Sequence, residues 1–305
     1  MDFYVVVNSI VVLFILMAVG YASYKAKIID RSAAGGLSSF LVNITLPCLI
    51  IISMQIPLNA EIFGNTMEMF LIAGIYYALS FVFALIVPKF FVKSDLERGV
   101  YRFMLVFSNL GFMGIPVTIA MFGDKAAFYT SLFMLPFGLL VFSAGILMLR
   151  PDMGKYFDIK LFINPGIIAS LIGLLFFFTG YSIPEPFFDV IDTLGSLTTP
   201  LAMVVVGALL AAMPITEMFS DKKIYIMSAF RLLVIPIALY LLLRPFVDDP
   251  LMLGIPVILA AMPVAANAVL LAEEYNVDSN AASKGVFIST LLCVATIPLI
   301  GVLLL

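Results

Sequence analysis

A succession of long apolar stretches limits the fold of this chain more than any other feature. Each is close to the ~20 residues that a helix needs to cross a bilayer. They number ten and lie at about 3–24, 33–55, 64–88, 99–121, 126–149, 162–181, 187–213, 224–246, 250–274 and 280–304. Backbone polar groups find no water inside a bilayer, so only helices or closed barrels span it. The sequence predicts an all-α polytopic membrane protein with ten transmembrane helices.

The composition agrees with this class. Of 305 residues, 63% are hydrophobic and 11% are charged, whereas soluble domains have about 45–50% apolar and about 25% charged residues. No basic run with interleaved aromatic residues indicates a nucleic acid partner. With two cysteines and no histidine, we expect no disulfide, metal centre or histidine proton relay. The first stretch lacks a basic leader, which is typical of a spanning helix rather than a cleaved signal peptide.

Lys and Arg predict the orientation. The connections after odd-numbered spans hold 13 of the 16 Lys and Arg residues, whereas those after even-numbered spans hold only Lys125 and Arg244. Because cytoplasmic loops are rich in Lys and Arg, the odd connections are predicted to be cytoplasmic. Both termini of this integral protein of the cell (inner or plasma) membrane are then expected outside the cytoplasm.

The two halves of the chain are predicted to be repeats of opposite orientation. With five spans per half, residues 1–149 and 162–305 enter the bilayer from opposite sides, so any five-helix repeat must be inverted. Corresponding spans also carry matching prolines, in the pairs Pro47 and Pro200, Pro116 and Pro263, and Pro136 and Pro298. The short charged connection at about 150–161 is predicted to be a cytoplasmic turn.

Two of the spans are interrupted. The fourth contains Ser108-Asn109-Leu110-Gly111-Phe112-Met113-Gly114-Ile115-Pro116, and the ninth contains Met262-Pro263-Val264-Ala265-Ala266-Asn267. A broken helix in hydrocarbon leaves N–H and C=O groups unpaired at several kcal/mol each, so it persists only where protein, water or ligand satisfies them. A break at Leu110–Pro116 therefore predicts a cavity. Paired broken helices in the two halves are typical of a transporter's binding site.

The chemistry expected at these breaks is anion binding. The N-terminus of a half-helix carries partial positive charge and free N–H donors, which suit a carboxylate. We expect helix dipoles and amides, rather than a lysine or arginine, to hold a small organic anion. The candidate substrate-binding residues are Ser108, Asn109, Gly111, Gly114, Pro116, Pro263 and Asn267. Close helix packing at small residues and an asparagine bond across helices form the structural alternative.

A second polar set lies on the second and seventh spans and is predicted to line the opposite wall of the pocket. Its members are Asn43, Thr45, Pro47, Thr198, Thr199 and Pro200. Threonine hydroxyls also bond back to their own helix, so both interpretations stay open here. The same holds for Thr130 and Ser131 on the fifth span and for Ser289 and Thr290 on the tenth.

The acidic residues concentrate in the connections, so a carboxylate proton relay at mid-bilayer is weakly supported. Sodium, the alternative coupling ion to the proton, can bind hydroxyls, amide oxygens and opened carbonyls. Its possible ligands are Ser108, Asn109, Thr130 and Ser131. No other cofactor is expected. Arg231 lies about 12 Å along a helix from Lys223, and we expect it to snorkel to the cytoplasmic interface rather than to capture an anion.

Enzymatic functions find little support. Gly123-Asp124 lies at a helix end without a second buried aspartate, and no histidine or lysine base accompanies a membrane serine. The sequence therefore predicts a protein that is not an enzyme.

Several motifs together resemble the auxin efflux carrier family over essentially the whole chain. They are Asn109 to Pro116, Asn164-Pro165 with Ser170 to Gly173, Leu194-Gly195 with Pro200 to Ala202 and Gly207-Ala208, and Ala261 to Asn267 with Ala272. The resemblance implies a fold related to bile acid sodium symporters, in which broken helices four and nine cross at their prolines. It also implies scaffold helices at about 3–55 and 162–213, which commonly form a homodimer. Transport-domain helices are implied at about 64–149 and 224–304.

Members of the family carry organic anions such as auxin or dicarboxylates. The resemblance implies a secondary transporter that works by elevator-like or rocking alternating access in the lipid bilayer. The sodium-binding symporters have an acidic residue near the proline of helix nine, which is absent beside Pro263 and puts sodium coupling in doubt. The alternatives are a membrane sensor or scaffold that binds an organic anion without moving it, and a channel.

Overall fold

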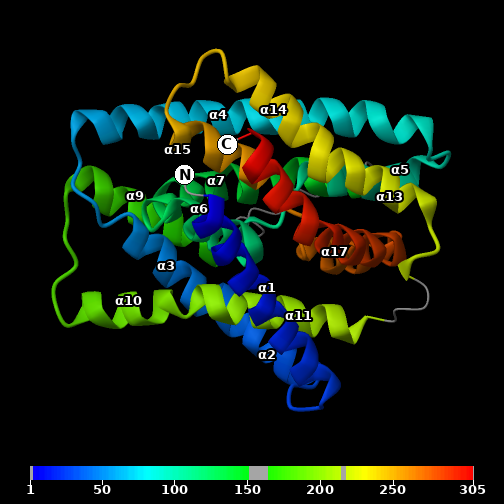
Figure 1. Ribbon diagram of the computed structural model, residues 1–305, viewed down its shortest axis with the longest axis horizontal. Helices are drawn as coiled ribbons and strands as arrows, with labels where there is room; N and C mark the ends of the chain where they lie inside the picture. Colours follow the sequence, from blue (N-terminus) through cyan, green and yellow to red (C-terminus); the bar gives the residue numbers. More distant parts are fainter. Residues whose placement is uncertain (1–2, 151–163, 214–217, 305) are drawn as a thin grey trace. The chain divides into compact units, whose positions relative to one another are not determined.

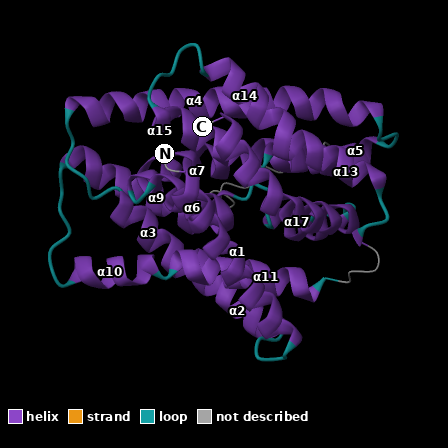
Figure 2. Ribbon diagram, viewed as in Figure 1, coloured by secondary structure: helices purple, strands orange, loops and turns teal. Residues whose placement is uncertain are grey.

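The computed structural model describes residues 3–150, 164–213 and 218–304. Within these ranges the regular structure is helical, and Figure 2 shows helices joined by loops without a strand. Six helical segments in the described chain are long and apolar enough to cross a membrane: Arg31–Ser53, Ala60–Phe90, Lys125–Leu149, Phe187–Ala212, Lys222–Leu243 and Ser279–Leu304. Shorter apolar helices are Val11–Lys25, Leu110–Phe122, Pro165–Thr179 and Pro250–Ala260. The all-helical membrane class is confirmed, and the ten-span inverted repeat stays a prediction.

The helices form two compact units. Unit 1 contains described residues within 1–71, 111–138 and 162–212. Its helices are α1 (Phe3–Lys25), α2 (Arg31–Phe40), α3 (Leu46–Ser53), the first part of α4 (Ala60–Ile86), α6 (Ile115–Phe122), most of α7 (Lys125–Leu140), α9 (Pro165–Thr179), α10 (Phe187–Ser196) and α11 (Thr198–Ala212).

Unit 2 contains described residues within 72–110, 139–161 and 213–305. Its elements are the remainder of α4, the 3₁₀ turn η2 (Val87–Phe90), α5 (Asp95–Val106), the π-helical turn η4 (Val141–Gly145), α8 (Ile146–Leu149), α13 (Lys222–Ala229), the π-helical turn η7 (Phe230–Val234), α14 (Ile235–Leu243), α15 (Pro250–Ala260), α16 (Asn267–Glu274) and α17 (Ser279–Leu304). The repeat boundaries and the scaffold and transport domains stay predictions.

Two glycines allow α1 and α11 to cross closely in unit 1 (Figure 1). A Cβ on Gly207 would lie 1.9 Å from the carbonyl oxygen of Met17, and a Cβ on Gly20 would lie 2.0 Å from that of Val204. Small residues drive helix association in lipid because they let backbones approach. Backbone contact therefore holds this helix pair together.

Proline explains the π-helical turns in three of the helical segments. The π-helical turns η1 (Leu41–Thr45), η3 (Leu110–Gly114) and η7 each end two residues before a proline, at Pro47, Pro116 and Pro236. Proline lacks the N–H for the i−4 carbonyl, and its ring clashes with that carbonyl. A widened turn relieves the clash and lets each segment continue as helix.

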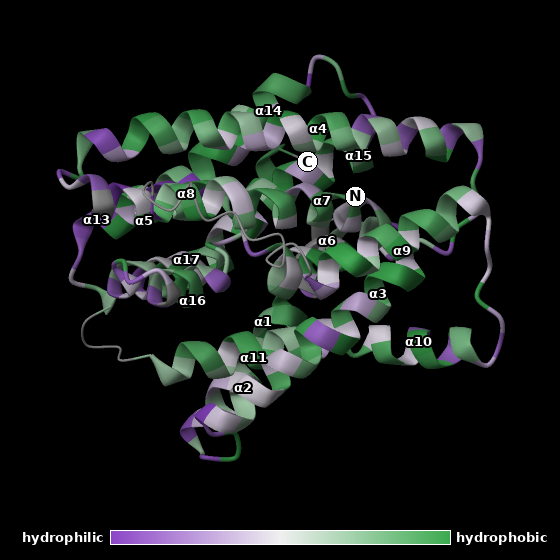
Figure 3. Cartoon of the chain, turned by 180° about the vertical axis from the view of Figure 1, so that it is seen from behind, coloured by the Kyte–Doolittle hydropathy of each residue, from purple (hydrophilic) through white to green (hydrophobic). Residues whose placement is uncertain are grey.

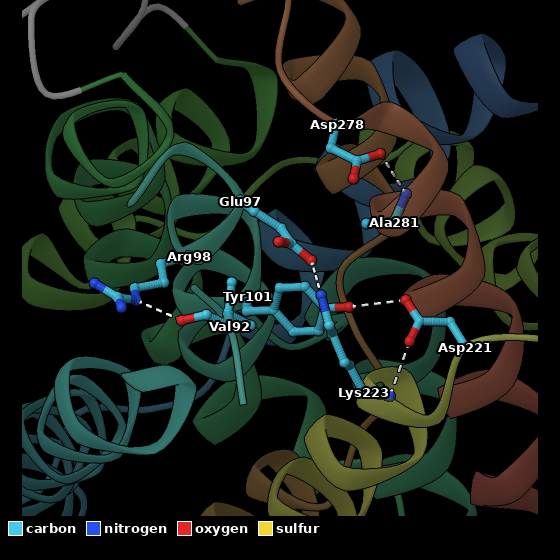
Figure 4. A network of polar contacts seen from close by, with 8 residues as sticks. All are labelled: Val92, Glu97, Arg98, Tyr101, Asp221, Lys223, Asp278 and Ala281. Carbon is cyan, nitrogen blue, oxygen red and sulfur yellow. Dashed lines mark hydrogen bonds and ion pairs between the residues drawn. The ribbon is translucent and has the colours of Figure 1, made fainter. Parts of the chain in front are cut away.

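In unit 2, a cluster of polar side chains joins the N-terminal part of α5 to the start of α13 (Figure 4). Lys223 on α13 donates to Glu97 on α5, and the hydroxyl of Tyr101 donates to Asp221 at 3.2 Å. Asp221 also accepts a bond from the backbone N–H of Lys223 and so caps α13. These contacts fix the start of α5 beside the start of α13.

Hydropathy follows the same division between helix ends and interiors. In Figure 3 the turn between α1 and α2 has hydrophilic and hydrophobic parts and the start of α13 is hydrophilic, whereas the helix interiors are mostly hydrophobic. This distribution agrees with apolar segments that end in polar connections.

Candidate functional site

Two helical segments of unit 2 are interrupted. Helix α5 ends at Val106, and Phe107 is extended with φ −100° and ψ 108°. Helix α15 ends at Ala260, and helical structure resumes with α16 at Asn267. The prediction of a break at Leu110–Pro116 is therefore wrong by a few residues: the chain opens at 107–109, and the predicted segment is already a π-helical turn leading into α6.

The two opened segments pair with one another. Ser108 and Val264 form an antiparallel bridge. The backbone N–H of Asn109 donates to the carbonyl of Pro263 at 2.9 Å, and that of Ala265 donates to the carbonyl of Phe107 at 3.0 Å. Pro263 lies in the paired segments, whereas Pro116 lies within the first turn of α6. The crossing of the two helices at these prolines stays a prediction.

Arg231 lies at this pairing, on the π-helical turn η7. Its Nε donates to the carbonyl of Met262 at 3.2 Å and its Nη1 to the carbonyl of Leu105 at 3.0 Å. Its Nη2 donates to the hydroxyl of Tyr76 at 2.9 Å. The guanidinium thus joins the last turn of α5, the break after α15 and the middle of α4.

The expectation that Arg231 snorkels to the interface is wrong. The residue is 0% exposed, and within the described chain no carboxylate forms an ion pair with it. The bonds to two carbonyls hold it inside because α5 and α15 leave those acceptors without helical partners. An arginine therefore lies at the paired segments, whereas the sequence prediction assigned anion binding there to helix dipoles and amides.

Tyr76 links the guanidinium to Ser108. Its hydroxyl oxygen lies 3.0 Å from Ser108 Oγ and 3.4 Å from the carbonyl of Val106. Because this oxygen already accepts a bond from Arg231, its own hydrogen is free to point to Ser108 or Val106. In the first case the hydroxyl of Ser108 keeps its hydrogen for another acceptor.

The carbonyls of the broken region are largely satisfied by the protein itself. Leu105 and Met262 accept bonds from Arg231, and Phe107, Ser108 and Pro263 accept bonds from backbone N–H groups. The backbone N–H of Val264 also has a partner, since it donates to the Oγ of Ser289 at 3.0 Å.

Donors at the start of α16 have no such partners. Within the described residues, the backbone N–H groups of Ala266 and Asn267 donate no hydrogen bond. The side-chain Oδ1 of Asn267, a hydrogen-bond acceptor, is buried and also has no partner. Asn109 is 4% exposed. The start of α16 therefore has two backbone donors and one buried side-chain acceptor without partners in the described residues.

The predicted residues in unit 1 lie on its helices. Asn43 is exposed and donates to Ser39 on its own helix, whereas Thr45 is buried and bonds back to Leu41 at 3.4 Å. Thr198 is buried with an unpartnered Oγ1. The other members are Gly111 and Gly114 in η3, Pro116 in α6, Pro47 at the start of α3, and Thr199 and Pro200 at the start of α11. Their part in binding stays a prediction.

The predicted sodium ligands are divided between the two units. In unit 1, Thr130 contacts Thr118 through a hydroxyl pair at 2.9 Å, and Ser131 donates to the carbonyl of Ala127 at 2.6 Å. In unit 2, Ser108 contacts Tyr76. The back-bonding alternative is therefore observed for Ser131.

Sequence reasoning missed two polar residues of α4. Tyr76 is buried and carries no motif that would reveal it. Glu68 is a half-buried acid within the same helix, although the acids were expected mainly in connections. The charge of Arg231 inside an apolar stretch was the available signal for the site, because ionisable residues at membrane depth usually mark function.

Comparisons with known proteins give a consistent result. A family model described as "Membrane transport protein" matches residues 5–158 and 149–301. A Rhizobium meliloti protein named "Putative malonate transporter" is 25% identical over 92% of this chain and 90% of its own length. Uncharacterized transporters from Methanocaldococcus jannaschii and Escherichia coli K12 are 23% and 21% identical, covering 98% and 96% of both chains.

Proposed function

The chain belongs to the membrane transport protein family, that of the auxin efflux carriers, and from this premise we propose that it is a secondary transporter of small organic anions. The observation that carries the proposal is the buried guanidinium of Arg231, which has no carboxylate partner in the described chain and lies where two interrupted helices pair. A buried charged side chain in a membrane protein is energetically costly, and such residues usually mark a functional site.

The proposed binding site lies at the start of α16. The backbone N–H groups of Ala266 and Asn267, which have no partner in the described residues, present donors to a carboxylate. The Nδ2 of the Asn267 side chain is proposed as a further donor. The N-terminus of a helix adds a partial positive charge to these donors. Ser108 supplies a hydroxyl on the neighbouring segment, and Arg231 supplies the net charge behind it.

We take a short dicarboxylate as the substrate class and malonate as the first probe, because one relative is named for malonate. Ion coupling, if present, stays open between sodium and proton. Transport by alternating access agrees with interrupted helices, whose opened backbone lines binding sites in secondary transporters.

The test is uptake of labelled malonate into proteoliposomes that contain the purified full chain. We expect saturable uptake that is accelerated by unlabelled malonate inside the vesicles. Ser108→Ala and Asn267→Ala should raise the half-saturating concentration about tenfold or more, since a hydrogen bond to a charged group contributes about 1.5–3 kcal/mol.

Matched controls exist on other helices. Ser143 bonds to its own helix at Leu139, and Asn65 donates to Tyr129. Ser143→Ala and Asn65→Ala should leave the half-saturating concentration unchanged. Binding of malonate without flux would favour a sensor, and flux that neither saturates nor responds to internal malonate would favour a channel. Absence of both binding and flux for every carboxylate tried would contradict the proposal.

We also propose that the chain has ten spans in two inverted repeats with both termini outside the cytoplasm, and that it forms a homodimer. The excess of Lys and Arg after odd-numbered spans supports the orientation. A reporter that fluoresces only in the cytoplasm, fused to either terminus, should stay dark, and a bright fusion at either end would contradict the topology. Light scattering of the purified protein measures its oligomeric state.

A further inference from the structure

The carbonyl oxygens opened by a broken helix are a common site for a coupling cation. Here Leu105 illustrates how such an acceptor arises. In an uninterrupted helix its carbonyl would accept a bond from the N–H of Asn109, but that N–H donates instead to Pro263 at 2.9 Å. The carbonyl of Met262 likewise lies in the break after α15.

Arg231 donates to both of these carbonyls, at 3.0 Å and 3.2 Å. A guanidinium is always charged and carries five N–H donors in a planar fork. The side chain is fully buried and attached to η7, so it cannot be exchanged with solvent ions as a bound metal can. It also lies 6.0 Å from the centroid of the Tyr76 ring, on whose face a cation is favoured.

Building on the proposed function, we propose that Arg231 is a tethered cation that takes the place of a coupling metal ion at the paired breaks, so that anion transport does not require sodium. The guanidinium donates hydrogen bonds to the opened carbonyls of both helices at all times. The region then keeps a positive charge in every step of transport, and the anion is the partner that balances it.

The test compares malonate uptake by wild-type proteoliposomes in sodium chloride, potassium chloride and choline chloride of equal concentration. We expect rates that agree within about twofold. Arg231→Gln removes the charge but keeps an amide donor, and should slow uptake in choline by about tenfold or more. Arg231→Lys keeps the charge and should retain most of the uptake.

A second measurement decides the question without transport. An ion that binds only the folded state raises the melting temperature of the protein. Sodium should leave the melting temperature of the wild type unchanged relative to choline, and should raise that of Arg231→Gln, whose carbonyls have lost their cation. A purely structural arginine would produce no sodium response in the variant.

The inference is overturned if sodium accelerates wild-type uptake about tenfold or stabilises the wild-type protein, or if Arg231→Gln transports like the wild type in choline. Wild-type protein that takes up no malonate in any medium would instead count against the proposed function, and the melting temperatures would still decide the role of Arg231. If Arg231→Gln does not fold, the wild-type measurements and Arg231→Lys decide it.

Discussion

Replacing Gly207 by alanine should weaken the pairing of α1 with α11. The added Cβ would lie 1.9 Å from the carbonyl oxygen of Met17 and 2.9 Å from the backbone nitrogen of Tyr21. Close carbon–oxygen contacts in proteins are about 3.3 Å, so the helices must move apart by roughly 1.4 Å at this point. Backbone atoms of a helix cannot rotate away as a flexible side chain can.

The size of the effect follows from two opposing terms. Overpacking costs about 1–3 kcal/mol, and a gap of 0.5–1 Å elsewhere along the interface forfeits a quarter to a half of each contact's attraction. Alanine recovers about 1 kcal/mol of helix propensity relative to glycine. We therefore expect Gly207→Ala to destabilise the protein by about 2 kcal/mol, because the clash outweighs the propensity.

The assay is thermal unfolding of the purified protein in detergent, with Gly64→Ala as the matched control. Gly64 lies on α4, and a Cβ there meets nothing within 4 Å. The control should therefore melt at the same temperature or higher. A Gly207→Ala protein as stable as Gly64→Ala would refute the close approach of α1 and α11.

The reciprocal glycine provides a further check on this geometry. Gly20 faces Val204 as Gly207 faces Met17. Once one alanine has separated the helices, the second finds room already made. We expect the double variant to cost less than the sum of the two single variants, since substitutions that share one backbone shift are not additive.

Three further predictions concern single side chains. Tyr76→Phe should destabilise the protein by about 1–3 kcal/mol in the same assay, because it removes the buried acceptor of Arg231; a change within error would show that this bond is dispensable. Thr118→Val should cost about 1 kcal/mol, since the hydroxyl donates to Gly114 at 2.8 Å and contacts Thr130; a stabilised variant would contradict this. Lys223→Met should change stability by less than about 1 kcal/mol, because the pair with Glu97 is partly exposed; a larger loss would mean that the cluster stabilises unit 2 more than exposed pairs normally do.

The helical class follows directly from the sequence, because apolar length alone selects membrane helices. The interruption beside Pro263 was also predictable, because a proline disfavours the helical conformation of the residue before it, and α15 ends at Ala260. The interruption before Pro116 was placed too late. Proline disturbs the turn that precedes it, and that turn is the π-helical η3. The non-helical residues therefore lie before η3, at 107–109, and not at the predicted Leu110–Pro116.

The role of Arg231 needed the structure. Its sequence position suggested a side chain long enough to reach the interface, and snorkelling is the usual outcome. The acceptors that hold it inside come from Leu105 and Met262, which lie far from it in the chain. Only the pairing of the two broken segments frees those carbonyls and brings them together. The contact with Tyr76 depends on the same tertiary arrangement.

The most direct test of the account is an experimental density map of the protein with bound malonate. We predict density for a carboxylate about 3 Å from the side-chain amide of Asn267 and from the N–H groups at the start of α16. That density should disappear in Asn267→Asp, which places a negative charge beside the ligand. Malonate bound elsewhere in the wild-type protein, with none at the start of α16, would contradict the account.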